Sequence, residues 1–372
     1  MRLRPFSLGL TSPLETARGS IEQREGFVVA VDPESDGDSV SEAGVGEATP
    51  LPGWTESLSA CEATLRGLQA DRDDAGLADA LARIDPGETP AARHGLALAL
   101  ADATARDAGR SLAEQLARDE RLPAPADAVP VNATIGDGDP ETTVAAAETA
   151  VAEGFGCLKL KVGSRALDAD VERLRAVRRA VDDGVAIRAD ANGAWDRETA
   201  REAVERLASL GLAYLEQPLP ADDVEGAAAL RDRRQGGEVG ADTDADTDPP
   251  VPIALDESVA SRGVDAVLDA GAADAVVLKP MALGGPDRAL AAAIRAREAG
   301  VEPVVTTTVD AVIARTAAVH VAAAIPDVAP CGLATGPLLD ADLAPDPCPV
   351  SERAIAVPSG SGLAGDAFDG LR

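Results

Sequence analysis

The sequence predicts an α/β protein in which a (β/α)7β barrel follows an α+β domain. From residue 129 onward, eight short runs of apolar and β-branched residues recur at intervals of roughly 28 residues. The segments between them place apolar residues three and four positions apart, and glycine closes several of them, as in amphipathic helices. Eight strand–helix units of this length are typical of a closed, TIM-like barrel rather than of an open sheet.

The eight predicted strands lie in residues 129–136, 157–162, 186–192, 214–219, 252–258, 275–280, 302–309 and 330–335. A short, proline-rich segment follows the last run, so we expect seven helices. The one long interval contains an acidic loop, residues 233–250, on the amino-terminal side of the next strand. Its spaced aspartates resemble the start of a calcium loop, but the required glycine and glutamate are missing, so we expect a solvated loop.

The patterns in residues 1–128 predict a separate α+β domain ahead of the barrel. Strand patterns lie at 2–8, 25–32 and 44–48, and amphipathic helix patterns lie at 55–69 and 89–109. The segment 346–372 is strand-like in part and is expected to return to this domain, which leaves residues 129–345 for the barrel.

The composition is strongly acidic, with a net charge of −30 and a pI of about 4.3. This charge argues against binding to nucleic acid or to an anionic membrane. Only three of the 34 basic side chains are lysine. Acidic excess with so little lysine resembles proteins of salt-loving organisms, so we expect a halophilic protein whose fold weakens at low salt.

The four cysteines are widely spaced, which predicts free thiols in a reducing, cytoplasmic setting. No apolar stretch is long enough to span a membrane. The sequence gives no indication of the oligomeric state.

Two of the three lysines, Lys159 and Lys161, lie two residues apart in the second predicted strand. Their side chains therefore share one face of the strand. Like-charge repulsion and partial burial are expected to lower the proton affinity of both, which would make a lysine usable as a general base. Because lysine is almost absent elsewhere, we assign this pair to function.

Three carboxylates end the next three strands: Asp190, Glu216 and Asp256. The carboxyl ends of barrel strands build the active site, so these side chains are expected to converge there. Oxygen ligands without nearby histidine or cysteine favour Mg²⁺, or Mn²⁺, over zinc. Asn192 shares the face of Asp190, whereas Glu257 is expected to point away.

The third lysine, Lys279, ends the sixth strand, so the lysines are expected to flank the metal from opposite sides. This layout suits removal of a proton next to the carboxylate of a small-molecule substrate, with the metal stabilising the enediolate.

Five segments carry a resemblance to a known family: CLKLKVG, IRADANGAW, YLEQPL, IALDES and VLKPMALGG. In this order they resemble the motifs of the muconate-lactonizing subgroup of the enolase superfamily. The segments TARGSIEQREGFVVAVD and GVGEATPLPGW are similar to its capping domain. KPMALGG, the threonines at 306–308 and GLATGPLLDADL are most similar to the o-succinylbenzoate synthase branch, which serves menaquinone biosynthesis.

The resemblance implies a role for each candidate residue. Lys161 would remove the α-proton and return it to the departing hydroxyl, and Lys279 would stabilise the anionic intermediate as a cation. Lys159 would tune Lys161 and touch the substrate carboxylate. The implied Mg²⁺ ligands are Asp190, Glu216 and Asp256, and the implied supporting or substrate-binding residues are Asn192, Arg188, Arg18, Thr307 and the loop 50–54.

Other functions remain open at this stage. The same two lysines would serve as opposed bases in an N-succinylamino acid racemase or a dipeptide epimerase. Muconate cycloisomerase resembles the chain less, and a non-catalytic barrel would not be expected to keep all three lysines and carboxylates. His94 and His320 have apolar neighbours and are predicted to be core residues rather than catalysts.

Overall fold

The computed structural model describes residues 1–372 except 17–18, 33–41, 71–75 and 236–249. It divides into two compact units. The first unit comprises Met1–Pro130, Leu278–Ile294 and Val305–Arg372, and the second comprises Val131–Val277 and Arg295–Val304. The acidic aspartates near 242–248 and Arg18 lie outside the described residues. The division into a capping domain and a barrel at residue 128 stays a prediction.

The second unit is built on a parallel sheet with the strand order β11-β10-β9-β8-β7-β6-β5. Sequential neighbours pair along the sheet, which curls as part of a barrel and confirms the predicted fold class. The strands are β5 (Ala133–Ile135), β6 (Cys157–Lys161), β7 (Ala186–Asp190), β8 (Tyr214–Glu216), β9 (Ile253–Leu255), β10 (Ala275–Leu278) and β11 (Glu302–Val305).

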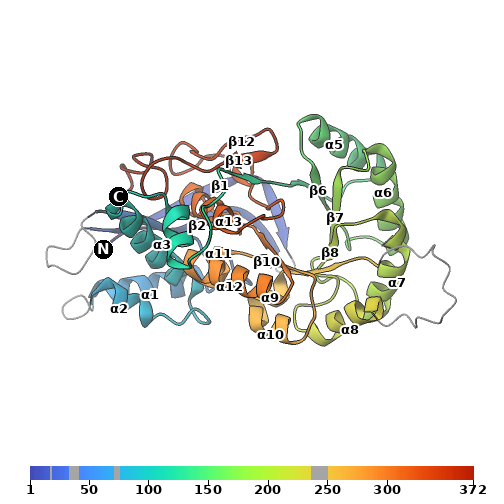
Figure 1. The fold of residues 1–372 in the computed structure, drawn as a ribbon, viewed down its shortest axis with the longest axis horizontal. Coiled ribbons are helices and arrows are strands. Elements are labelled where there is room, and N and C mark those ends of the chain that lie inside the picture. Colours follow the sequence, from blue (N-terminus) through green and yellow to red (C-terminus); the bar gives the residue numbers. More distant parts are fainter. Residues whose placement is uncertain (17–18, 33–41, 71–75, 236–249) are drawn as a thin grey trace. The chain divides into compact units, whose positions relative to one another are not determined.

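Helices connect these strands as the spacing predicts, and α5 to α8 stand outside β6, β7 and β8 (Figure 1). Asp139 and Asp196 accept hydrogen bonds from the backbone at the starts of α5 and α7, where a carboxylate is favourable. The helices are α5 (Pro140–Ala152), α6 (Leu167–Ala180), α7 (Arg197–Leu207) with the short η1 (Ala208–Leu210), α8 (Val224–Gln235), α9 (Glu257–Arg262), α10 (Val264–Asp269), α11 (Pro280–Leu283), α12 (Pro286–Glu298) and α13 (Val312–Ala324).

Two of the eight predicted strands differ from expectation. The run 129–136 is divided: β4 (Ala128–Pro130) pairs antiparallel with β13 (Ala354–Ala356), and only β5 joins the parallel sheet. The run 330–335 makes isolated bridges, one of them parallel between Thr306 and Gly332, instead of a regular strand. Proline lacks an amide donor and glycine weakens a strand, so Pro330 and Gly332 limit extension here.

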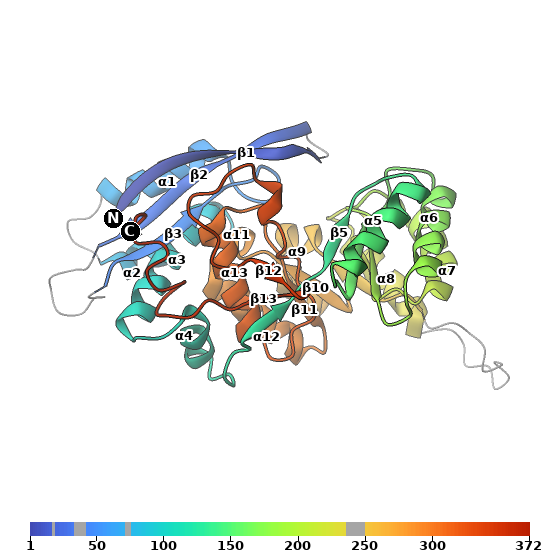
Figure 2. The ribbon, with the colours of Figure 1, turned by 90° about the horizontal axis from the view of Figure 1, so that it is seen from above.

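The first unit contains the predicted antiparallel sheet of β1 (Arg2–Thr16), β2 (Gly19–Val31) and β3 (Gly44–Ala48), with α3 (Pro90–Asp107) against β3 (Figure 2). A Cβ at Gly46 would stand 2.1 Å from the carbonyl oxygen of Gly95. The helix therefore approaches the strand at a distance that only glycine permits.

The remaining elements of the first unit are α1 (Leu58–Ala70), α2 (Leu77–Ala82), α4 (Leu112–Asp119), η2 (Gly336–Leu338) and β12 (Val350–Ser351). Strand β13 joins β12 to β4, so the C-terminal segment shares a sheet with residues 128–130. Both histidines lie in this unit and are fully buried, as predicted.

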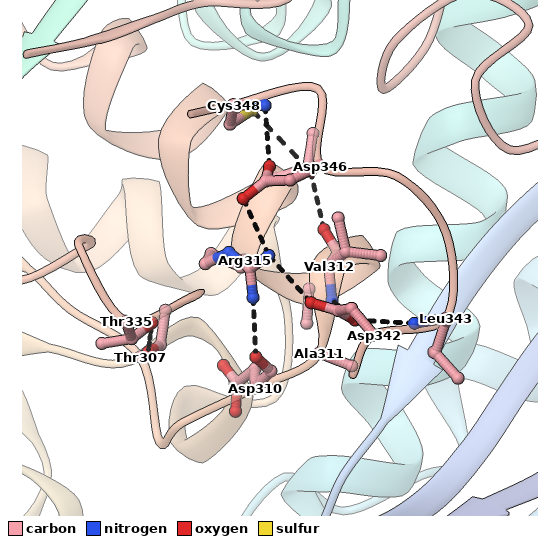
Figure 3. A network of polar contacts seen from close by, with 12 residues as sticks. Thr307, Asp310, Ala311, Val312, Arg315, Thr335, Asp342, Leu343, Asp346 and Cys348 are labelled. Carbon is pink, nitrogen blue, oxygen red and sulfur yellow. Dashed lines mark hydrogen bonds and ion pairs between the residues drawn. The ribbon is translucent and has the colours of Figure 1, made fainter. Parts of the chain in front are cut away.

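Ion pairs of the buried Arg315 fix the start of α13 and the segment that follows residue 335 (Figure 3). Arg315 lies between Asp342 and Asp346, with nitrogen–oxygen distances of 2.9 and 3.0 Å. Asp342 also accepts a hydrogen bond from the amide of Val312, in the first turn of α13. One arginine therefore ties the helix to the loop at two points. None of the described helices is long and apolar enough to cross a membrane.

Candidate active site

Strand register brings the predicted residues of the second unit into two rows. Lys161 lies opposite Asp190, and Asp190 lies opposite Glu216, at the carboxyl ends of β6, β7 and β8. One step deeper along the same face, Lys159 lies opposite Arg188 and Arg188 lies opposite Tyr214. Because side chains alternate along a strand, both rows point the same way.

Lys159 is the inner lysine and bridges two carboxylates. Its Nζ atom lies 2.7 Å from Oε1 of Glu216 and 2.9 Å from Oδ2 of Asp190. The lysine side chain is 15% exposed, and both carboxylates are buried. A buried ammonium requires such partners, so the carboxylates of Asp190 and Glu216 hold Lys159 in place.

Lys161 is the outer lysine, and its side chain is 34% exposed. Its Nζ atom lies 2.7 Å from Oδ2 of Asp190 and donates to Oδ1 of Asn192 at 2.9 Å. Behind it, buried Arg173 donates to the backbone carbonyl of Lys161. The end of β6 is therefore fixed from the helix side while the Lys161 amine faces outward.

The electrostatics correct the expectation that both lysines lose proton affinity. Burial alone would lower the pKa of Lys159, but the charges of Asp190 and Glu216 outweigh it and raise the pKa well above its usual value. Burial would raise the pKa of Asp190, yet the two ammonium groups hold it below its usual range. Burial and the charge of Asp190 raise the pKa of Glu216 to about 7. The sequence pattern could not indicate this, because the deciding charges lie on neighbouring strands.

Asp256 is positioned by a residue that sequence reasoning missed. Gln217 follows Glu216 with a left-handed φ of 39° and accepts hydrogen bonds from the amides of Asp256 and Ser258 at 3.0 and 3.1 Å. The side-chain Nε2 of Gln217 donates to the backbone carbonyl of Leu219 and to the hydroxyl of Ser258. The only sequence signal was a polar residue that directly follows an apolar strand.

Glu257 does not point away from the site, contrary to expectation. Its Oε1 atom accepts a hydrogen bond of 3.0 Å from Nδ2 of Asn192, whose Oδ1 in turn accepts from Lys161. Asn192 has a left-handed φ of 46°, and its amide donates to Asp190. Glu257 begins α9, so a change from strand to helix directs its side chain differently from the alternation assumed for a strand.

Arg188 supports the inner row. It is buried, and its guanidinium carbon lies 4.6 Å from the ring centroid of Tyr214. Its Nη1 donates to Oδ1 of Asn132 at 3.3 Å. These contacts place a fixed positive charge beneath the carboxylates.

The donor set suits a hard divalent cation. Glu216 Oε2 is buried and has no hydrogen-bond partner among the described residues, and the charges of Asp190 and Asp256 both raise the pKa of Glu216. Carboxylate oxygens clustered in this way favour Mg²⁺. In the part of the chain that the structure describes, however, no three acidic, histidine or cysteine side chains are grouped around one ion position. The Lys159 ammonium lies between Asp190 and Glu216 in this arrangement.

Lys279 and Thr307 belong to the first unit. Lys279 directly follows β10, is 8% exposed, and its Nζ lies 3.3 Å from the ring centroid of Trp54. Thr307 is buried and exchanges a 3.0 Å hydrogen bond with Thr335 (Figure 3). Sequence reasoning had named both residues without finding the Trp54 contact.

Comparison with known proteins agrees with this fold. The family model described as enolase C-terminal domain-like matches residues 142–366. The chain belongs to the enolase superfamily. Within it, the relatives place the chain in the muconate-lactonizing subgroup.

The similar proteins are enzymes with different reactions. An o-succinylbenzoate synthase of Thermobifida fusca is 40% identical over 60% of this chain and 65% of its own length. An N-succinyl-L-Arg/Lys racemase of Bacillus cereus is 32% identical over 52% of this chain and 48% of its own length. The match therefore spans less than two thirds of either relative. A dipeptide epimerase from Enterococcus faecalis, complexed with Mg and a dipeptide, has a TM-score of 0.81 at 25% identity and covers 98% of both chains.

Proposed function

We propose that this protein is an Mg²⁺-dependent lyase that converts 2-succinyl-6-hydroxy-2,4-cyclohexadiene-1-carboxylate to o-succinylbenzoate, a step of menaquinone biosynthesis. One observation carries the chemistry. Lys161 presents a half-exposed amine at the carboxyl end of β6, within 2.7 Å of the carboxylate of Asp190. An amine so placed suits removal of a proton next to a bound carboxylate.

Asp190, Glu216 and Asp256 would hold the metal, and Asn192 and Arg188 would orient this carboxylate cluster. When bound, Mg²⁺ supplies positive charge that stabilises an enediolate at the substrate carboxylate. Burial and the charge of Asp190 raise the pKa of Glu216, so a nearby cation is needed for both carboxylates to stay charged.

In the proposed reaction Lys161 takes the α-proton, which breaks a carbon–hydrogen bond. The same ammonium then gives that proton to the departing hydroxyl, so the carbon–oxygen bond breaks, water leaves and the ring becomes aromatic. Lys279 contributes a positive charge to the anionic intermediate, and Lys159 stays a cation because its carboxylate partners raise its pKa. The two lysines of β6 therefore have distinct tasks.

The choice of reaction is supported by the 40% identity to the Thermobifida fusca synthase. The alternative is racemisation of N-succinylamino acids or epimerisation of dipeptides, which the Bacillus cereus and Enterococcus faecalis relatives favour. In that case Lys161 and Lys279 would act as two bases on opposite faces of the substrate.

A pair of assays separates these functions. Purified protein in high salt with Mg²⁺ is given the cyclohexadiene substrate, and separately an N-succinyl-L-amino acid in D₂O. Loss of diene absorbance without deuterium uptake by the amino acid supports the synthase. Deuterium uptake by the amino acid without turnover of the diene would contradict the synthase proposal and support the racemase.

A further inference from the structure

We propose that Trp54 is a positioning residue for Lys279: its ring face holds the lysine ammonium in place as the cation of the reaction. The proposal rests on the proposed function for its catalytic meaning, but the contact itself can be tested separately. The Lys279 Nζ atom lies 3.3 Å from the ring centroid of Trp54, and both residues lie in the first unit. Among the aromatic side chains, tryptophan offers the most favourable ring face to a cation.

Trp54 is presented by a closed turn rather than by a loose loop. The amides of Trp54 and Thr55 donate to the carbonyl of Leu51 at 2.9 and 3.0 Å, and the Thr55 hydroxyl accepts from the amide of Leu51. Gly53 has a φ of 103°, a conformation that glycine adopts without strain. These hydrogen bonds fix the backbone of the turn and so restrict where the Trp54 ring can lie.

The turn is anchored at both ends. Before it, buried Arg24 donates to the carbonyls of Thr49 and Pro50 at 2.9 and 3.2 Å. After it, the carboxylate of Glu56 accepts hydrogen bonds from the amides of Ala91 and Ala92, in the first turn of α3. A carboxylate is favourable at this end of a helix, so α3 fixes where the Trp54 turn lies.

The same helix fixes the backbone that follows Lys279. Arg93 of α3 donates to the carbonyl of Gly284 at 2.5 Å and forms an ion pair with Asp287 at 2.9 Å. Gly284 ends α11 with a φ of 88°, and the amide of Leu283 donates to the carbonyl of Lys279. Helix α3 thus positions both members of the pair, which explains how a tryptophan on a distant turn meets this lysine.

The contact has a chemical consequence at a buried ammonium. Lys279 is 8% exposed, so little water remains to solvate its charge. The indole face replaces part of that solvation and restricts where the flexible side chain can place Nζ. Loss of the ring is therefore expected to lower the rate of the chemical step more than it weakens substrate binding.

The near-absence of lysine makes a direct test possible. Protein labelled with ¹³C at the lysine ε-carbons gives signals from three residues only, which Lys→Arg variants assign. A methylene group over an indole face experiences a ring current, so the Lys279 ε-protons are expected upfield of their ordinary position. Trp54→Leu should return them to that position, and Trp54→Phe should keep part of the shift. Phe6→Leu, which removes a ring elsewhere in the unit, should leave the signal unchanged.

Activity is measured on the same variants with the cyclohexadiene substrate. Trp54→Leu is expected to lower kcat about tenfold with a smaller change in KM, and Trp54→Phe should recover much of the loss. An identical Lys279 signal in the unsubstituted protein and Trp54→Leu would overturn the contact. If Trp54→Leu moves the Lys279 signal but leaves kcat unchanged, the positioning role would be overturned. If the unsubstituted protein does not turn over the diene, the proposed reaction fails, whereas the labelled spectra still decide whether Trp54 holds Lys279.

Discussion

The Nζ atom of Lys161 lies 2.7 Å from Oδ2 of Asp190, and strand register pairs the same two residues across β6 and β7. The pairing of the two strands places these side chains next to each other, so the contact follows from the backbone register. Asp190 is shared, because Lys159 reaches the same oxygen at 2.9 Å. The two lysines therefore contact one carboxylate, and Lys161 is the more exposed of the two.

Replacement of Glu216 by Gln is expected to remove most of the stabilisation that Mg²⁺ gives the fold. A ligand that binds only the folded state stabilises it by about 3 kcal/mol at a hundred times its Kd, and the amide removes one charged ligand. The measurement is the rise in Tm between chelator and excess Mg²⁺. Glu198→Gln, an exposed change in the first turn of α7, serves as the control and should keep the full rise. An equal rise in both variants would exclude Glu216 as a ligand.

Acid is expected to destabilise the first unit through His320. The amide of Ala113 donates to its Nδ1, and its Nε2 lies 2.6 Å from the carbonyl of Leu363, so the neutral ring is satisfied on both sides. Burial lowers the pKa of His320 to about 4, below the value near 6.5 of an unfolded chain. The resulting stability is complete above pH 6.5 and is lost as the pH falls through 4.

The measurement is the denaturant midpoint at pH 7 and at pH 4.5 for the unsubstituted protein and His320→Gln, both in molar KCl. Glutamine can offer an acceptor and a donor but does not titrate. We expect the unsubstituted protein to lose about 2–3 kcal/mol more than the variant over this interval. Equal losses would show that the pKa of His320 is the same in the folded and in the unfolded protein.

Salt is expected to stabilise the fold because the net charge is −30. The screening length falls from about 10 Å at 0.1 M to about 3 Å at 1 M, which weakens repulsion among surface carboxylates. The test is the Tm in dilute buffer and in 2 M KCl, with sucrose of equal osmolality as a non-ionic control. Equal melting in dilute buffer and KCl would contradict the interpretation of the composition.

The barrel, and the meeting of Lys161, Asp190 and Glu216 at the carboxyl ends of three strands, could be predicted because they depend on local pattern and period. Asp190 and Glu216 each end an apolar strand, and parallel strands place their carboxyl ends together. Contacts between distant segments could not be predicted in this way. Gln217 orients Asp256 through a left-handed backbone, and Trp54 meets Lys279 because both are anchored on α3.

The incorrect expectations share a physical cause. The expected fall in the pKa of Lys159 rests on its neighbour of like charge in the sequence, Lys161. In the structure its ammonium contacts Asp190 and Glu216, whose charges raise that pKa. Glu257 was assigned to a strand face, although α9 begins there. In both cases the deciding feature was tertiary or a change of element, which no short sequence pattern contains.

Lys161→Arg tests the central claim most directly, with Lys159→Arg as the matched change on the same strand. Arginine keeps a positive charge beside Asp190 but does not release its proton near neutral pH. We expect Lys161→Arg to lower kcat for diene dehydration by 10³-fold or more, on the order expected for loss of a general base, while the Mg²⁺-induced rise in Tm remains. Full activity of Lys161→Arg would contradict the account.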